Sequence, residues 1–148
     1  MAVKYRIPAI GEGKSVAKSI IRAGAHEFII DEPAERHGTD EGPAPLEYLV
    51  GAFIGCTNVI ASRIAGEMGI TLHNDHIEAE AEVDGAVLTG DDCPLVFPRL
   101  KLKVKGRTDA SPEQVEELKR QLAIRCPVSA LFRQSGTEVV EEWDLEAL

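Results

Sequence analysis

The stretch "PLEYLVGAFIGCTNVIASRIAGEMG", residues 45 to 69, constrains the fold more than any other part of the chain. Its apolar residues recur at intervals of three and four, which is the spacing of one face of an α-helix, at positions 46, 49, 53, 56, 60, 64 and 68. Pro45 suits the first helical position, and Gly66 or Gly69 suits the end. The pattern predicts a long, mostly buried helix that carries Cys56 near its middle.

The segments on either side of this helix have the patterns of strands. Residues 3–31 contain the runs "YRIPAI", "SVAKSIIRAG" and "HEFIID", which predict an antiparallel N-terminal sheet followed by a polar loop. Two alternating runs within residues 76–106 predict a pair of strands joined by a loop that contains "GDDCP". The run "TEVVEEWDL" near the end predicts a last strand.

A second helix is predicted from Ser111 onward. Ser111 and Gln114 have the spacing of a capping box, and the buried side of the helix carries Val115, Leu118 and Leu122. Pro127 interrupts this helix, and a further turn or two follows. The order of strands, helix, strands, helix and strand predicts an α+β fold. With 148 residues, 44% of them hydrophobic, the chain is long enough for one core, so we expect a single domain over residues 1–148.

The charge and composition exclude several classes of function. The formal net charge is −9, the acidic residues are spread along the chain, and no basic stripe for a nucleic acid is visible. The N-terminus has no run of signal-peptide type, and no segment approaches the roughly 18 consecutive apolar residues of a membrane span. We therefore expect a cytoplasmic protein. In that reducing compartment three cysteines indicate redox or packing roles rather than a disulfide framework.

Cys56 has two interpretations. It lies on the apolar stripe with Phe53 and Ile60, and free cysteine is among the most buried residue types, which favours a packing role. Gly51 and Gly55, four residues apart, leave room beside it for another backbone or a substrate, although small residues also permit tight helix packing. The pattern alone favours packing and leaves a reactive thiol open.

Glu47 lies in the first turn of the same predicted helix, where the helix dipole favours a carboxylate. Nine residues separate it from Cys56, which places the two side chains about 180° apart around an ideal helix and about 13 Å apart along it. They cannot touch within one straight helix. If they cooperate, a longer cation must bridge them, or each must meet its partner across a subunit interface.

The other two cysteines differ in their surroundings. Cys126 directly precedes Pro127, so it suits the N-cap of the following helix, where the helix N-terminus and the adjacent Arg125 would lower the thiol pKa. The alternative is a junction cysteine without chemistry. Cys93 follows two aspartates, which discourage thiolate formation, and we expect no essential role for it.

Other chemistries have weaker signals. His73 and His76, with Asp75 between them, have the only short metal-ligand spacing, and no cysteine pair accompanies them, so a solvated turn is favoured and no metal is expected. The sequence has no G-x-S-x-G nucleophile elbow and no phosphate-binding glycine loop of the P-loop kind.

Together, "DEP…GTDEGPAPLEYLVGAFIGCTNV" and "RCPVSALF" some seventy residues later resemble the OsmC/Ohr family of osmotically inducible and organic hydroperoxide resistance proteins. The likeness covers nearly the whole chain, and the run from Gly42 to Thr57 is quite specific together with Cys126 and Pro127. The glycine pair common in the family's loop reads His37-Gly38 here.

The resemblance implies a thiol peroxidase with an OsmC-like α+β fold and an intertwined homodimer with sites at its interface. It assigns Cys56 as the peroxidatic cysteine and Cys126 as the resolving cysteine, with organic hydroperoxides as substrates and hydrogen peroxide as a weaker one. The sulfenic acid on the first thiol condenses with the second to a disulfide. An external dithiol or lipoylated protein would reduce it, and no cofactor is needed.

The resemblance also implies an arginine held by the glutamate that matches Glu47. A thiol in an apolar pocket has a raised pKa, and a nearby cation offsets the cost of the thiolate. Arg22 is the nearest match, although Ile20 and Ile21 replace the glycine pair that usually precedes the arginine. The alternatives are Arg36 and Arg133.

Two functions therefore remain open from the sequence. The first is a dimeric cysteine peroxidase whose apolar walls admit alkyl tails, built from Leu49, Phe53, Ile60 and Leu131. The second is a protein of the same fold that binds a small apolar ligand or senses redox state without turnover. Only the enzyme requires a thiolate at Cys56 near neutral pH and rapid disulfide formation with Cys126.

Overall fold

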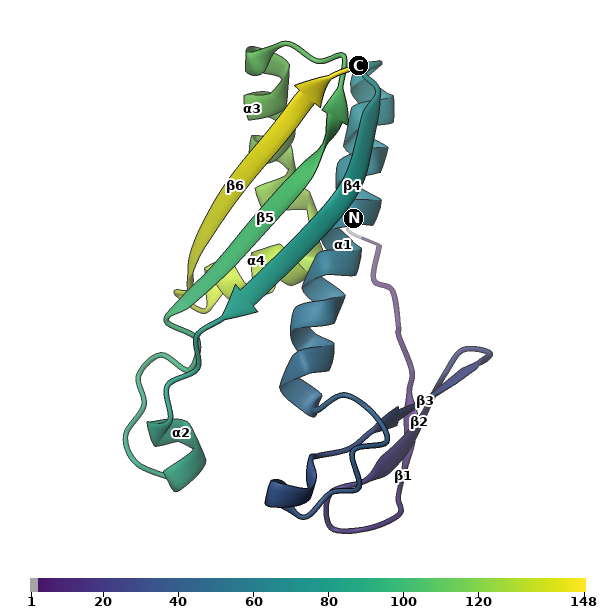
Figure 1. The fold of residues 1–148 in the computed structure, drawn as a ribbon, viewed down its shortest axis with the longest axis vertical. Coiled ribbons are helices and arrows are strands. Elements are labelled where there is room, and N and C mark those ends of the chain that lie inside the picture. The colour runs from purple at the N-terminus through teal and green to yellow at the C-terminus, as the bar shows by residue number, and fades with distance from the viewer. Residues whose placement is uncertain (1–2) are drawn as a thin grey trace. The chain divides into compact units, whose positions relative to one another are not determined.

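The computed structural model describes residues 3–148, which divide into two compact units (Figure 1). The first unit ends at Leu49 and the second comprises Val50–Leu148, so the boundary falls inside one long helix. An isolated stretch of fewer than 50 residues buries little apolar surface. The single domain expected from the sequence stays a prediction.

The first unit contains a three-stranded antiparallel sheet in the order β1-β2-β3, as predicted. Its strands are β1 (Ile10–Gly13), β2 (Ser19–Ala23) and β3 (His26–Ile30). The predicted first strand was "YRIPAI", but pairing begins only at Ile10. Pro8 lacks a backbone N–H, and residues 3–9, which are exposed, form no strand.

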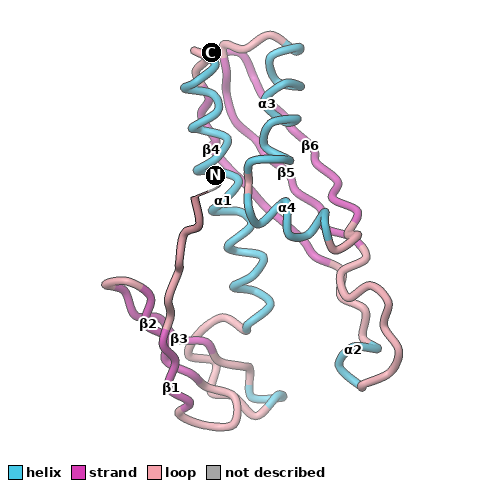
Figure 2. Tube along the Cα trace, turned by 180° about the vertical axis from the view of Figure 1, so that it is seen from behind, coloured by secondary structure: helices cyan, strands magenta, loops and turns pink. Residues whose placement is uncertain are grey.

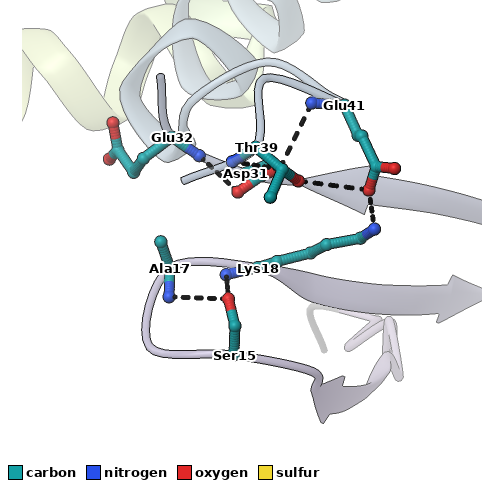
Figure 3. A network of polar contacts seen from close by, with 7 residues as sticks. All are labelled: Ser15, Ala17, Lys18, Asp31, Glu32, Thr39 and Glu41. Atoms are coloured by element: carbon teal, nitrogen blue, oxygen red, sulfur yellow. Dashed lines mark hydrogen bonds and ion pairs between the residues drawn. The ribbon is translucent and has the colours of Figure 1, made fainter. Parts of the chain in front are cut away.

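After β3, the loop at residues 31–44 is organised by one buried carboxylate (Figure 3). Asp31 accepts hydrogen bonds from the Thr39 hydroxyl, at 2.6 Å, and from the backbone N–H groups of Glu32, Thr39 and Glu41. Lys18 forms an ion pair with Glu41, which ties the hairpin between β1 and β2 to the same network. A short 3-10 helix, η1 (Ala34–Arg36), lies within this loop.

The predicted central helix is α1 (Pro45–Met68), 24 residues long. It ends where Gly69 adopts a positive φ of 69°, and the N–H of Ile70 donates to the carbonyl of Ala65. The expectation of a mostly buried helix is wrong for the single chain. Its fully buried residues are Phe53, Thr57, Ala61, Ile64 and Ala65, so the buried stripe lies about one residue further around the helix than the apolar spacing predicted.

Much of α1 is therefore apolar and uncovered in one chain. An 18-residue window of it has a mean hydropathy of 1.4, and 28% of that window is buried. The helix is long and apolar enough to cross a membrane by length and composition. Because the core helix of a soluble protein passes the same test, this finding assigns no membrane location.

The second unit contains a three-stranded sheet in the order β4-β5-β6. Strand β4 (Leu72–Ala81) pairs antiparallel with β5 (Arg99–Thr108), and β6 (Glu138–Ala147) pairs parallel with β5. Both predicted strands are present, although β4 begins four residues before residue 76 and β5 extends two residues beyond residue 106. A short helix, α2 (Ala86–Thr89), lies in the loop between β4 and β5.

Helices α1, from Val50 onward, and α3 (Pro112–Arg125) lie side by side on one face of this sheet (Figures 1 and 2). Strand β5 turns Leu100, Leu102 and Val104 toward them, while its alternate residues are basic. The predicted capping box at α3 is confirmed, because Ser111 accepts from the N–H of Gln114, whose side chain accepts from Ser111.

The predicted interruption at Pro127 is also present. Helix α3 ends at Arg125, and α4 (Pro127–Gln134) begins after Cys126, whose extended backbone conformation turns the chain between them. A core cluster joins the two long helices and includes Cys126 together with Ala61, Ile64, Ala65, Leu118 and Leu122. The junction cysteine is thus part of the core that α1 and α3 share.

Candidate active site

Two cysteines that are far apart in the sequence meet between α1 and the start of α4. The Sγ atoms of Cys56 and Cys126 lie 2.7 Å apart, with the Cys126 thiol as donor, and both thiols are free. Cys126 is fully buried, whereas Cys56 is partly exposed. The structure therefore pairs the two cysteines that the sequence singled out.

The N-terminus of α4 contacts the thiol of Cys126 as predicted, but burial raises the pKa of this thiol more than the helix N-terminus lowers it. Cys126 is the N-cap, and its Sγ accepts from the N–H of Ser129 at 3.4 Å. Burial raises the pKa of the Cys126 thiol to about 11, and the hydrogen bond with Cys56 adds to the increase. The expectation of a lowered pKa is wrong. Arg125 does not assist either, because its guanidinium binds Glu67.

The two thiols of the pair differ in burial and in hydrogen bonding. At neutral pH a thiol with a pKa of about 11 keeps its proton, so Cys126 is a hydrogen-bond donor to the sulfur of Cys56. Cys56 is the more accessible residue of the two, and its sulfur accepts that hydrogen bond.

The apolar surroundings of the pair are only partly those predicted. Phe53 is fully buried and packs edge-to-face on Phe132 with ring centroids 6.0 Å apart, and Ile60 is half-buried. Leu131 was expected in the wall, but its side chain is 60% exposed. It lies on the outer side of α4 because the helix turns Ser129 and Phe132 inward.

Glu47 and Arg22 both lie in the first unit, and each has another partner there. The Glu47 carboxylate accepts from the N–H of Ala44 at 2.7 Å and so caps its own helix. Arg22 pairs with Glu27, its cross-strand neighbour, at 2.9 Å. Within residues 3–49 the arginine and the glutamate implied by the resemblance are therefore not paired with each other.

The alternative arginines also have acidic partners. Arg36 pairs with Glu32 in the loop, and both belong to the first unit. Arg133 lies in α4 and donates to the hydroxyl of Ser129 and to the carboxylate of Glu141. Arg133 therefore contacts the first turn of α4, which begins at Cys126.

The residues given minor roles lie apart from this pair. Cys93 is partly exposed in the loop between β4 and β5, where it follows α2. His73 and His76 lie on β4, and Asp75 between them is bound by Arg107 through both carboxylate oxygens. Among residues 3–148 no group of three His, Cys, Asp or Glu side chains could hold a metal ion.

A family model described as OsmC-like protein matches residues 38–142. The chain belongs to the OsmC-like protein family. The match includes both cysteines of the pair and the second half of the loop that precedes α1. No curated protein is significantly similar in sequence.

Solved structures of this family share the fold along almost the whole chain. An OsmC-like protein from Mycoplasma pneumoniae is similar with a TM-score of 0.77 at 18% identity, covering 99% of each chain. An organic hydroperoxide resistance protein OsmC from Legionella pneumophila has a TM-score of 0.64 at 15% identity, covering 98% of this chain and 99% of that one. The organic hydroperoxide resistance protein OhrB of Bacillus subtilis has a TM-score of 0.60 at 20% identity, covering 96% and 98%. The α+β OsmC-like fold expected from the sequence is confirmed.

The sequence analysis missed one polar group of this site. Glu141 lies on the helix-facing side of β6, in the same register as Val139 and Trp143, and its side chain is only 9% exposed. A glutamate in the apolar register of "EVVEEW" is a signal that strand alternation alone could have revealed.

Proposed function

We propose that this OsmC-like protein is a thiol peroxidase that reduces organic hydroperoxides, and hydrogen peroxide more weakly. The observation that supports the proposal most directly is the contact of Cys56 with Cys126 at 2.7 Å, a distance from which a disulfide forms with little movement. Family relatives whose names refer to organic hydroperoxide resistance support the substrate class.

The proposed reaction has two steps on the protein. The Cys56 thiolate attacks the distal oxygen of the hydroperoxide, the O–O bond breaks, and the alkoxide leaves and takes up a proton to become the alcohol. The sulfur keeps the hydroxyl group as a sulfenic acid. Cys126 then attacks that sulfur, the S–O bond breaks, and its proton leaves with the hydroxide as water. An external dithiol returns two electrons and two protons to the disulfide.

Arg22 and Glu47 are the residues that we propose to complete the site. The reaction needs a cation to stabilise the thiolate and the leaving alkoxide. The Arg22–Glu27 pair is exposed, with 63% of the arginine side chain accessible, and exposed ion pairs contribute little to stability. Arg22 can therefore exchange Glu27 for another anionic partner at small cost, and Glu47 would then hold it.

We propose that the protein works as a homodimer. The chain exposes several large apolar side chains in its second unit, among them Val59 at 55%, Ile124 at 68% and Leu131 at 60%. A side chain at Gly51 or Gly55 would meet nothing within 4 Å, so the exposed face of α1 has room for the close approach of another chain. Sedimentation analysis tests this proposal, and a monomer at micromolar concentration would contradict it.

The remaining partners follow from the chemistry. The disulfide must be reduced after each cycle by a small dithiol or a dithiol-containing protein such as a lipoylated or thioredoxin-type protein. A compartment that keeps thiols reduced supports this cycle, so we infer a cytoplasmic location. The reaction as written uses no metal or organic cofactor.

The test is a stoichiometric oxidation. The protein is reduced, freed of reductant and mixed with one equivalent of cumene hydroperoxide or, separately, hydrogen peroxide. Free thiols are then counted against time, and disulfides are mapped by mass spectrometry. We expect two thiols per chain to be lost rapidly, mapped to Cys56 and Cys126, and faster with the organic peroxide. Thiols that persist would contradict the enzyme and favour a binding or redox-sensing protein.

A further inference from the structure

A continuous chain of polar contacts leads from the second cysteine to the sheet. The N–H of Ser129 donates to Cys126 Sγ, and the Ser129 hydroxyl accepts from Arg133 Nε at 3.2 Å. Arg133 Nη2 donates to Glu141 Oε1 on β6 at 2.7 Å. The first turn of α4, which begins at the N-cap Cys126, is therefore connected to β6 through the side chains of Ser129, Arg133 and Glu141.

The Glu141 carboxylate, at the β6 end of these contacts, has a second hydrogen-bond partner. The second carboxylate oxygen of Glu141 accepts from Trp143 Nε1 at 3.1 Å. The carboxylate thus uses one oxygen for the indole and the other for Arg133. A nearly buried carboxylate costs free energy unless it is paired and hydrogen-bonded, and apolar neighbours occupy the same register. The position of this charge is therefore determined by its two partners.

The guanidinium of Arg133 makes two hydrogen bonds in directions that a single ammonium group would not fix. Its guanidinium donates through Nε to a hydroxyl on its own helix and through Nη2 to a strand, so two separate donors of one rigid plane are in use. The arginine thereby fixes α4 against β6 at the residue whose backbone N–H contacts Cys126.

We propose that Arg133 and Glu141 are positioning residues that set the geometry of the Cys56–Cys126 pair for disulfide formation. The role of the disulfide in turnover rests on the proposed function, but the geometric effect does not require a peroxide. An S–S bond requires about 2.05 Å and a restricted dihedral angle, so a turn that is free to move lowers the effective concentration of one thiol at the other.

The experiment measures the equilibrium of the pair with dithiothreitol. Two electrons and two protons pass from Cys56 and Cys126 to oxidised dithiothreitol, which is reduced while the protein disulfide forms. The ratio of the two forms at equilibrium gives the effective concentration of the thiols. The variants are Arg133→Met, which keeps the length of the stem, and Arg133→Lys, which keeps the charge but has one point donor.

The matched control is Glu138→Gln, which lies on β6 like Glu141 and breaks the exposed pair that Glu138 forms with Arg99 of β5. We expect Arg133→Met to lower the effective concentration at least tenfold, which corresponds to about 30 mV for this two-electron couple. The effective concentration in Arg133→Lys should lie between those of Arg133→Met and the wild type. In Glu138→Gln it should remain within twofold of the wild-type value. Thermal unfolding of each variant is measured in parallel.

Three outcomes would overturn the proposal. These are an Arg133→Met equilibrium within twofold of the wild type, an equal change in Glu138→Gln, and full recovery in Arg133→Lys, which would assign the effect to charge alone. The proposed peroxidase function has a separate test. It is contradicted if cumene hydroperoxide leaves the wild-type thiols reduced while exchange with oxidised dithiothreitol still forms the disulfide. The two proposals can therefore fail independently.

Discussion

Cys126 donates its thiol hydrogen to the sulfur of Cys56, 70 positions earlier in the sequence, across a distance of 2.7 Å. Cys56 lies within α1, and Cys126 is the N-cap of α4, so the contact joins the two helices. Cys126 is fully buried and burial raises the pKa of its thiol, whereas Cys56 is partly exposed. The two cysteines therefore differ because of burial rather than because of their positions in the sequence.

We expect Cys126→Ser to stop the reaction at the sulfenic acid. Cys56 remains, so one equivalent of cumene hydroperoxide should form one sulfenic acid per chain, trapped with a dimedone-type reagent and counted by mass spectrometry. Cys56→Ser should give no sulfenic acid and no turnover. Cys93→Ser is the control and should match the wild type, because this cysteine lies in the loop between β4 and β5. Full turnover in the Cys56 variant would exclude Cys56 as the nucleophile.

Local signals in the sequence predicted the elements of this site, and the family resemblance implied the Cys56–Cys126 pair, whereas the polar contacts between α4 and β6 were not predicted. The capping box at Ser111 and the break at Pro127 depend on neighbouring residues and were found. The partner of Arg133 was not, because Glu141 reaches it only after β6 has paired in parallel with β5. The buried face of α1 was also misplaced by one residue, since the small residue Ala61 occupies it and hydrophobic spacing gives small residues little weight.

The thiol of Cys126 should titrate above its usual range even without its neighbour. Burial is the largest cause of its raised pKa, and the hydrogen bond with Cys56 is the second. In a Cys56→Ala, Cys93→Ser double variant the two contributions of Cys56 are removed, while burial, the largest cause, still opposes the N–H groups of Ser129 and Val128. We therefore expect thiolate absorbance to appear above the model-peptide value of about 8.5. Adding Cys126→Ser supplies the control that subtracts tyrosine ionisation. A midpoint at or below 8.5 would show that the helix N-terminus outweighs burial.

Asp31 should make the stability of the protein depend on pH. The hydroxyl of Thr39, followed by backbone N–H groups, holds the pKa of this carboxyl below its ordinary value. A lowered folded-state pKa gives stability that is present above the unfolded value of about 3.9 and is lost as the pH falls through the folded value. Urea unfolding of Asp31→Asn and the wild type should therefore differ most near neutral pH and converge in acid. Asp40→Asn, an exposed carboxylate of the same loop, is the control and should show little difference at either pH.

Gly38 should tolerate no side chain. A Cβ at this position would lie 1.6 Å from the carbonyl oxygen of Glu32 and 2.8 Å from the Asp31 carboxylate, so the backbone of the loop would have to move away from the network in Figure 3. Overpacking of this kind typically costs about 1–3 kcal/mol, and backbone atoms cannot give way as a flexible side chain does. We expect Gly38→Ala to lower the free energy of unfolding by at least about 2 kcal/mol in urea denaturation. Gly13→Ala is the matched control, because a Cβ there meets nothing within 4 Å, and it should stay within about 0.5 kcal/mol of the wild type. Equal stability of the two variants would mean that the loop can rearrange around Asp31 without loss, and the carboxylate would then not determine the loop's conformation.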